Sequence, residues 1–95
     1  METNTTLFYY GQPEVYEKLL QYCAASGFKV KDNVTKFYFI GAKKRYILFW
    51  KNKRIELQIE LVGKKQVQVT AAIFQYGKRQ PTQENEFIKE IQKFF

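Results

Sequence analysis

From Ile55 to Leu61, apolar and polar residues alternate without a break, and this pattern dictates much of the expected architecture. A period of two places every second side chain on the same face of a β-strand, so one face is buried and the other meets solvent. The run Val67–Ile73 continues the pattern, and Tyr46–Trp50 is a third strand-like run. Residues 51–54 and 63–65 contain asparagine or glycine and fit short hairpin turns. We therefore predict an antiparallel meander with the odd-numbered apolar residues of the last two runs pointing inward.

The N-terminal part predicts one strand and one helix. Thr6–Tyr10 is rich in aromatic residues and is followed by Gly11, which favours an edge strand. Proline is well suited to the first turn of a helix, so we expect a helix from Pro13 to Ser26. Gly27 is expected to end it in the left-handed conformation. The apolar residues of this helix follow a helical spacing and form one stripe, made of Tyr16, Leu19, Leu20 and Cys23.

Two further regions complete the prediction. Residues 28–40 fit either a bulged strand or a short hairpin, with Asp32–Asn33 as a turn signal. Residues 77–81 are expected to form a loop, and Thr82 is the predicted N-cap of a second helix that runs to Phe95. The acidic residues near its start and the lysines near its end match the helix dipole.

These elements predict an α+β domain. Two helices with one apolar side each, and a sheet with one apolar face, bury their apolar surfaces when both helices cover the same face. We expect a twisted antiparallel sheet of four to five strands, arranged as a meander, with the first helix and the C-terminal helix packed on one face. The chain is predicted to be a single domain over residues 1–95, with residues 1–5 disordered.

Four features of this layout occur together. They are the helix ending at Ser26–Gly27, the aromatic strand ending at Trp50, the amphipathic strand Ile55–Leu61, and the Gly77–Lys78 loop before the last helix. In layout, from Leu7 to Phe95, the chain resembles small uncharacterised bacterial domains. The resemblance implies the β-α-β…β-α arrangement and a bacterial or phage origin. It implies no activity and no site.

The composition argues against catalysis and metal binding. The chain has no histidine, which removes the commonest general base and metal ligand. Cys23 is the only cysteine, and its place on the apolar helix stripe predicts a buried structural thiol. Glu56 and Glu60 would lie about 13 Å apart on one strand, which is typical of a solvated face. We expect a protein that is not an enzyme and has no cofactor and no metal.

The sequence also predicts the cellular compartment of the protein, which we expect to be the cytoplasm. A single cysteine cannot form an internal disulfide, which fits a reducing cytoplasm. The polar segment Met1–Thr6 lacks the basic and apolar regions of a signal peptide. Apolar runs are all shorter than the roughly 20 residues that cross a bilayer, so we expect no membrane span.

The positive charges predict one kind of binding site. The chain has 16 Lys and Arg against 9 Asp and Glu, a net charge of +7, which favours nucleic acid or other acidic partners. In a meander, alternate turns share one end of the sheet, so we expect an anion or nucleic-acid site made of Lys51, Lys53, Arg54, Lys78 and Arg79, with Trp50 beside it. A second basic group would combine Lys43, Lys44 and Arg45 with Lys64 and Lys65. Charged turns are also common without any ligand.

The open face of the sheet predicts another kind of site. Phe74 and Tyr76 have the parity opposite to the inward residues, and Tyr38 is expected to point outward between its neighbours. Exposed aromatic residues in one patch often mark interaction sites, although a bulge would shift the parity and bury them. The sequence therefore favours a binding domain that contacts an unknown protein partner, or forms a homodimer, through this face. Binding of nucleic acid or another polyanion by the basic turns is the alternative.

Overall fold

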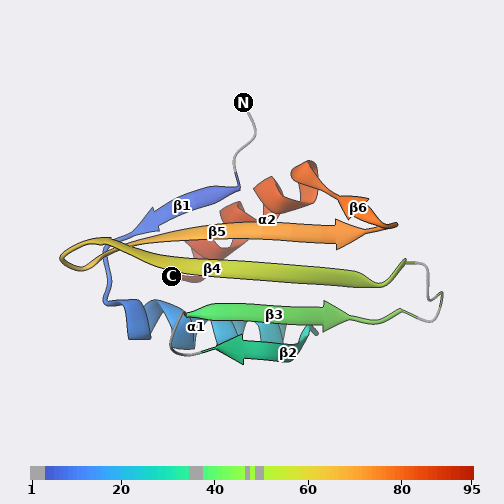
Figure 1. The fold of residues 1–95 in the computed structure, drawn as a ribbon, viewed down its shortest axis with the longest axis horizontal. Helices are drawn as coiled ribbons and strands as arrows, with labels where there is room; N and C mark the ends of the chain where they lie inside the picture. Colours follow the sequence, from blue (N-terminus) through green and yellow to red (C-terminus); the bar gives the residue numbers. More distant parts are fainter. Residues whose placement is uncertain (1–3, 35–37, 47, 49–50) are drawn as a thin grey trace.

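The computed structural model describes residues 4–34, 38–46, 48 and 51–95. Within these residues the chain forms two helices and a six-stranded sheet (Figure 1). The bounds in chain order are β1 Thr5–Phe8, α1 Gln12–Ala25, β2 Lys29–Val34, β3 Phe39–Lys44, β4 Lys53–Gly63, β5 Gln66–Gln75, β6 Lys78–Arg79 and α2 Pro81–Phe94.

The sheet is antiparallel throughout, with the strand order β1-β5-β4-β3-β2. Strand β6 pairs with the same edge of β5 as β1 does, farther along β5. Strands β2 to β5 form the predicted meander, and α1 carries the chain from the β1 edge to the β2 edge (Figure 1). The predicted α+β class is therefore confirmed, with six strands in place of the four or five expected.

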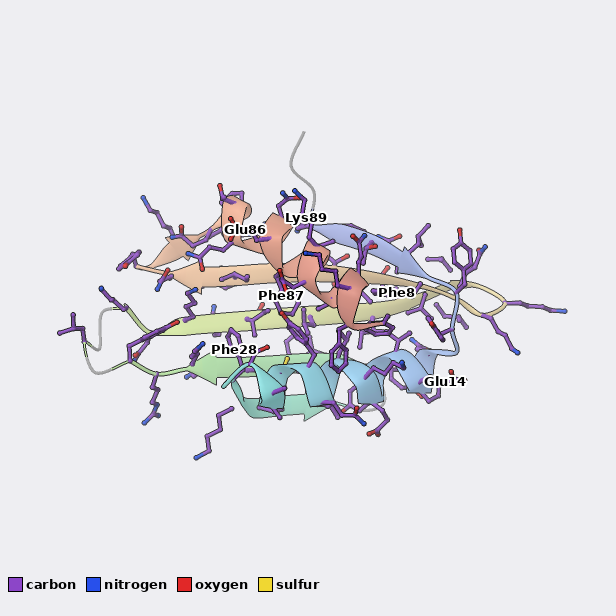
Figure 2. All side chains as sticks on the ribbon, turned by 180° about the vertical axis from the view of Figure 1, so that it is seen from behind. Phe8, Glu14, Phe28, Glu86, Phe87 and Lys89 are labelled. Carbon is purple, nitrogen blue, oxygen red and sulfur yellow. The ribbon has the colours of Figure 1, made fainter. Side chains whose placement is uncertain are left out.

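Both helices cover one face of the sheet, as Figure 2 shows from the helical side. The buried residues of α1 include Val15, Leu19 and Cys23, and those of α2 include Ile88 and Ile91. These side chains pack against the inward residues of the sheet in one core. Within the described residues, the opposite face of the sheet carries no helix (Figure 1).

The predicted alternation in β4 and β5 is confirmed except at one position. The inward side chains with exposures of 4% or less are Ile55, Leu57, Ile59, Val67, Val69, Ala71 and Ile73. Leu61 has the same parity but is 60% exposed, so the inward prediction is wrong there. The register of β4 shifts between Leu61 and Gly63, and the hairpin tip extends past the helices (Figure 1). The two described helices do not reach this hairpin tip, and Leu61 is left exposed.

The first helix ends as its sequence predicts. Gly27 has a φ of +85°, a conformation that costs glycine little because it has no Cβ. The N–H of Phe28 donates to the carbonyl oxygen of Cys23 at 2.9 Å, and the N–H of Gly27 donates to that of Ala24 at 3.2 Å. This pair of hydrogen bonds is the Schellman motif, and it directs the chain into β2.

The predicted strand Tyr46–Trp50 is wrong. The strand that precedes β4 is β3, which buries Ile40 and Ala42 and pairs Lys44 with Lys53. Tyr46 and Leu48 lie outside the strands and are exposed, and Trp50 lies outside the described residues. Aromatic richness suggested a strand, but β3 ends at Lys44 and β4 begins at Lys53; residues 47 and 49 also lie outside the described part of the chain.

Residues 28–40 combine the two alternatives that the sequence left open. Strands β2 and β3 form a hairpin, and β2 carries a bulge between Val30 and Asp32. Asp32 and Asn33 lie inside β2, where they pair with Gly41 and Ile40, so the predicted turn at this pair is wrong. The extra residue of the bulge allows the strand to continue through this polar pair.

The start of α2 also differs from the prediction. The helix begins at Pro81, and Gln80 is the N-cap residue, without a side-chain capping hydrogen bond. Thr82 was the predicted N-cap but lies inside the first turn. Proline fixes φ near the helical value and has no N–H to satisfy, so Pro81 can serve as the first helical residue.

The outer edge of β5 is covered by several short pieces of chain. Strand β1 pairs with residues 67–70. Asn4 continues this pairing: its carbonyl oxygen accepts from the N–H of Ala71 at 2.8 Å, and its Nδ2 donates to the carbonyl of Ala71 at 3.0 Å. At Ile73, the N–H donates to the Glu84 carboxylate and the carbonyl accepts from the N–H of Gln80. Strand β6 covers the last residues of β5. Asn4 and Thr5 were expected to be disordered with residues 1–3, which lie outside the described residues, but they form part of this edge.

Candidate functional site

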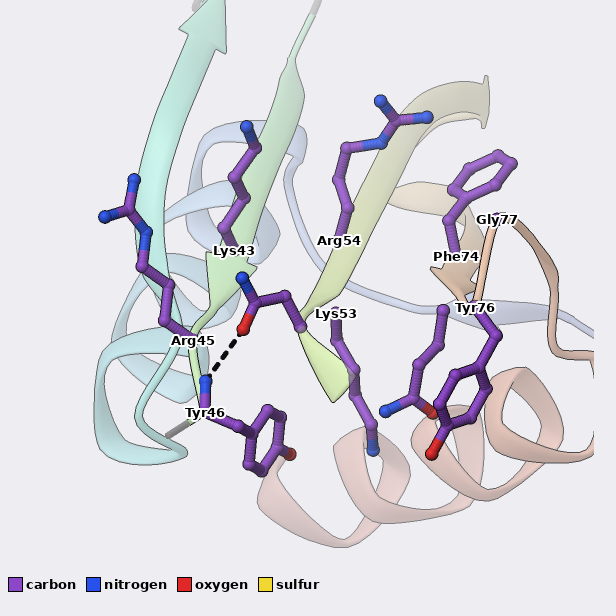
Figure 3. Close-up of a pocket in the computed structure, with 10 residues that line it drawn as sticks. Lys43, Arg45, Tyr46, Lys53, Arg54, Phe74, Tyr76 and Gly77 are labelled. Atoms are coloured by element: carbon purple, nitrogen blue, oxygen red, sulfur yellow. Dashed lines mark hydrogen bonds between the residues drawn. The ribbon is translucent and has the colours of Figure 1, made fainter. Parts of the chain in front are cut away.

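A hollow of about 600 Å³ lies at the end of the sheet where β4 begins (Figure 3). It lies between the β3–β4 connection on one side and the turn after β5 on the other. Its lining combines four cations, three aromatic side chains and, among the described residues, no carboxylate. The lining residues are Lys43, Arg45, Tyr46, Asn52, Lys53, Arg54, Phe74, Gln75, Tyr76 and Gly77.

A row of positive side chains crosses the open face beside this hollow. The strand register pairs Lys29 of β2 with Lys43 of β3, and Lys43 with Arg54 of β4. Neighbouring strands lie about 4.8 Å apart, so the three backbone positions span about 10 Å. Figure 3 shows Lys43 and Arg54 pointing the same way. Like charges directly opposite each other are destabilising, so this row stores a repulsion that a bound anion would relieve.

The row continues with an aromatic ring. Arg54 pairs with Phe74 of β5, and the guanidinium Cζ lies 4.6 Å from the centre of the Phe74 ring. The Arg54 Nε also lies 3.6 Å from the Glu56 carboxylate, and both of these side chains are well exposed. An exposed ion pair of this kind contributes little to stability, so Arg54 can turn to another anion at small cost.

A two-residue turn presents Tyr76 at the rim of the hollow. Tyr76 and Gly77 both have positive φ, +58° and +75°, which matches the type I′ turn that joins β5 to β6. The predicted loop over 77–81 is wrong in part, because Lys78 and Arg79 pair with the end of β5 as the short strand β6. The Tyr76 ring is 56% exposed.

Gln75 fixes the floor of the hollow. Its buried Nε2 donates to the carbonyl of Lys51 at 2.7 Å, which ties the β3–β4 connection to β5. Its Oε1 accepts from Gln83 Nε2 and its carbonyl accepts from Gln80 Nε2, both at 2.8 Å. These bonds join the connection, the end of β5 and the start of α2 in one network. On the other rim, the N–H of Tyr46 donates to Asn52 Oδ1 at 2.8 Å, the contact drawn in Figure 3.

The structure divides the basic residues differently from the prediction. Because β3 ends at Lys44 and β4 begins at Lys53, both sides of the connection lie at the same end of the sheet. Lys43 and Arg45 therefore line the hollow together with Lys53 and Arg54, and their predicted grouping with Lys64 and Lys65 is wrong. That pair lies at the opposite tip, in the β4–β5 hairpin.

Two of the basic residues in the predicted groups, Lys44 and Arg79, contact other parts of the fold instead of the hollow. Lys44 Nζ donates to the carbonyl of Ser26 at 3.1 Å, next to the rings of Phe28 and Tyr46. Arg79 was a predicted site residue, but its guanidinium is bound to Glu84. In the part of the chain that the structure describes, the only ion pairs are those of Arg54 and Arg79.

The other predicted basic residues have different places. Lys51 is exposed in the β3–β4 connection, and Lys78 is exposed in β6. Neither lines the hollow. The prediction for Trp50 cannot be placed, since this residue is outside the described part of the chain.

The predicted aromatic patch on the open face is only partly formed. Phe74 lies on this face under Arg54. Tyr38 was expected to face outward, but it packs with the core and its ring meets that of Tyr16 edge to face at 5.5 Å. Tyr38 has a φ of +48° and lies before β3, so strand parity does not apply to it. Instead of Tyr38, the next residue Phe39 has the strand parity of the open face, and it is partly buried.

Glu84 is the residue that sequence reasoning did not single out. Glu84 is 1% exposed, and its carboxylate accepts hydrogen bonds from Ile73 N–H at 2.9 Å and from Arg79 at 2.8 and 3.0 Å. Burial acts to raise the pKa of Glu84, but these hydrogen bonds and the charge of Arg79 outweigh it and lower the pKa below its ordinary value. Its spacing could have indicated its burial. Glu84 shares one helix stripe with Phe87, Ile88 and Ile91, and it is the only polar residue of these four.

Other chemistry has little support within the described residues. Burial raises the pKa of the Cys23 thiol to about 11, so the thiolate is scarce at neutral pH. The described residues contain no group of three or more acidic, cysteine or histidine side chains that would hold a metal ion. None of the described helices is long and apolar enough to cross a bilayer.

Comparison with known proteins adds no relative. No protein-family model matches the sequence, and no curated protein is significantly similar to it. The site must therefore be interpreted from its own geometry, which is that of a cationic hollow with aromatic rims beside a row of cations on an open sheet.

Proposed function

We propose that this protein is a non-enzymatic domain that binds nucleic acid through the hollow and the basic row beside it. The observation that carries the proposal is the cross-strand row of Lys29, Lys43 and Arg54 on the face that neither of the described helices covers. A polyanion with regularly spaced phosphates can neutralise neighbouring cations in such a row. The aromatic side chains at the hollow supply surfaces on which bases can stack.

This proposal is favoured over a protein interface on the open face. An apolar contact there was expected to include Tyr38, which is partly buried and packs against the core, and Phe74, whose ring lies under a guanidinium. The centre of the face is lined mainly by polar and small side chains, including Glu56, Gln58 and Thr70. The large exposed apolar patch that marks many interaction sites is not formed by these residues.

Fluorescence anisotropy with a labelled single-stranded DNA of about 12 nucleotides tests the proposal, because one small binding domain occupies about 4–16 nucleotides. If four cations each neutralise one phosphate, the slope of log affinity against log salt is about −3. Affinity should then fall about 50-fold between about 50 and about 200 mM salt. The triple variant Lys43→Ser, Lys53→Ser, Arg54→Ser should weaken binding at least about 10-fold at the lower salt concentration.

The matched control removes three positive charges elsewhere. Lys64→Ser, Lys65→Asn and Lys89→Ser change exposed residues of the hairpin tip and of α2. Asparagine is used at position 65 because Lys65 has a φ of +52°. Retention of binding by this control, with loss in the hollow variant, supports the proposal. Equal losses in both, or no salt-dependent binding by the unmodified protein, would overturn it and favour a protein partner or a second copy.

A further inference from the structure

A second, smaller hollow adjoins the first on the basic side. It has a volume of about 260 Å³ and is lined by Gly27, Lys29, Lys43 and Arg45. Lys43 and Arg45 line both hollows and so form a ridge between them. The two hollows differ in chemistry, because the larger has aromatic side chains and the smaller has three cations and, among the described residues, no ring.

The exposed Tyr76 ring is the most informative part of the larger hollow. A type I′ turn favours asparagine or glycine at its first central position, because other residues are strained at positive φ. Tyr38 also has positive φ, but its ring packs against Tyr16, whereas the Tyr76 ring is largely exposed at the rim. Tyr76 therefore presents an exposed aromatic residue at the rim of a basic hollow, where a base can reach its ring.

We infer that the ligand is a single strand, with one unstacked base in the larger hollow against Tyr76 and the following phosphates on the Lys43–Arg45 ridge and Lys29. This inference rests on the proposed function and specifies its ligand. The larger hollow is within the range of about 300–1,000 Å³ of small-molecule sites, whereas the smaller one is below it. A duplex keeps its base faces stacked, so it cannot offer a base to the ring.

Two variants separate stacking from phosphate binding. Tyr76→Asn removes the ring but keeps a residue that tolerates positive φ, and it creates the Asn-Gly pair preferred in this turn. It should weaken single-strand binding about 10-fold or more and leave the salt slope unchanged. Lys29→Ser should weaken binding less and reduce the magnitude of the salt slope by about 0.7.

The control for the ring is Tyr9→Asn. Tyr9 is 70% exposed and follows β1, at the hairpin-tip end of the sheet. This variant should bind the single strand as the unmodified protein does. The same anisotropy assay should show single-stranded DNA binding at least about 10-fold tighter than a duplex of the same sequence.

The outcomes distinguish this inference from the proposed function. If Tyr76→Asn binds normally and duplex competes as well as single strand, the inference that a base stacks on Tyr76 is wrong. This holds even when the variant Lys43→Ser, Lys53→Ser, Arg54→Ser has lost binding and the proposed function stands. If Lys29→Ser leaves the salt slope unchanged, the phosphate path over the ridge is wrong. If the triple variant binds normally, the proposed function itself fails.

Discussion

Replacing Glu84 by glutamine would measure how much stability depends on a single buried carboxylate. In the structure its two oxygens accept three hydrogen bonds, one from Ile73 N–H and two from Arg79. Glutamine has the same shape, but when its one carbonyl oxygen keeps the bonds from Ile73 N–H and Arg79 Nε, its amide group faces the Arg79 Nη2 donor. The half-exposed Arg79 side chain can then turn to water.

The expected cost follows from these contacts. A hydrogen bond to a charged group contributes about 1 kcal/mol more than one to a neutral group, and a partly exposed ion pair adds about 0.2–1 kcal/mol. Glu84→Gln should therefore lower the free energy of unfolding by about 1.5 kcal/mol at pH 7. For a domain of this size, the melting temperature should fall by about 6–12 °C.

The effect should depend on pH in a defined direction. The folded-state pKa of Glu84 lies below its unfolded value of about 4.3, so the stabilisation is fully present above that value. It is lost as the pH falls through the lower folded-state pKa. Urea unfolding followed by circular dichroism should therefore show a stability difference between the two proteins at pH 7 that shrinks at about pH 3.

Glu86→Gln is the matched control, since Glu86 lies on the same helix but is exposed. It should change the free energy of unfolding by less than about 0.5 kcal/mol. The reasoning is refuted if the control costs as much as Glu84→Gln. It is also refuted if the cost of Glu84→Gln is the same at both pH values.

Other outcomes are expected from the same structure. Gln75→Leu should lower the free energy of unfolding by about 2 kcal/mol in urea titrations, because it leaves the Lys51 carbonyl without its donor; unchanged stability would contradict this. Cys23 should react with Ellman's reagent at pH 8 far more slowly in the folded protein than in urea, and equal rates would contradict its burial. Gly27→Ala should cost about 1 kcal/mol or more in thermal unfolding, whereas Gly11→Ala, where φ is −67°, should cost less.

The sequence predicted the parts of the fold that local periodicity controls. The alternation from Ile55 onward and the helical stripe around Leu19 both place the correct side chains in the core. The first meander strand was misplaced, because aromatic residues near Trp50 favour a strand locally while the pairing of Lys44 with Lys53 is a non-local property.

The same limit explains the errors at the candidate site. Moving the first meander strand from Tyr46–Trp50 to β3 brings Lys43 and Arg45 to the end that carries Arg54. The inward turn of Tyr38 depends on a positive φ that strand parity does not describe. The predicted group therefore contained Lys53 and Arg54, which line the hollow, and left out Lys43 and Arg45, which line it too.

The covered edge of β5 has a consequence for self-association. A ten-residue strand at a sheet edge would offer a long template for another chain. Here that side is divided into a four-residue strand, a two-residue strand and an interval closed by Asn4, Gln80 and the Glu84 carboxylate. A neighbouring molecule therefore meets only a short, interrupted edge on this side, which discourages the addition of its strands to this sheet.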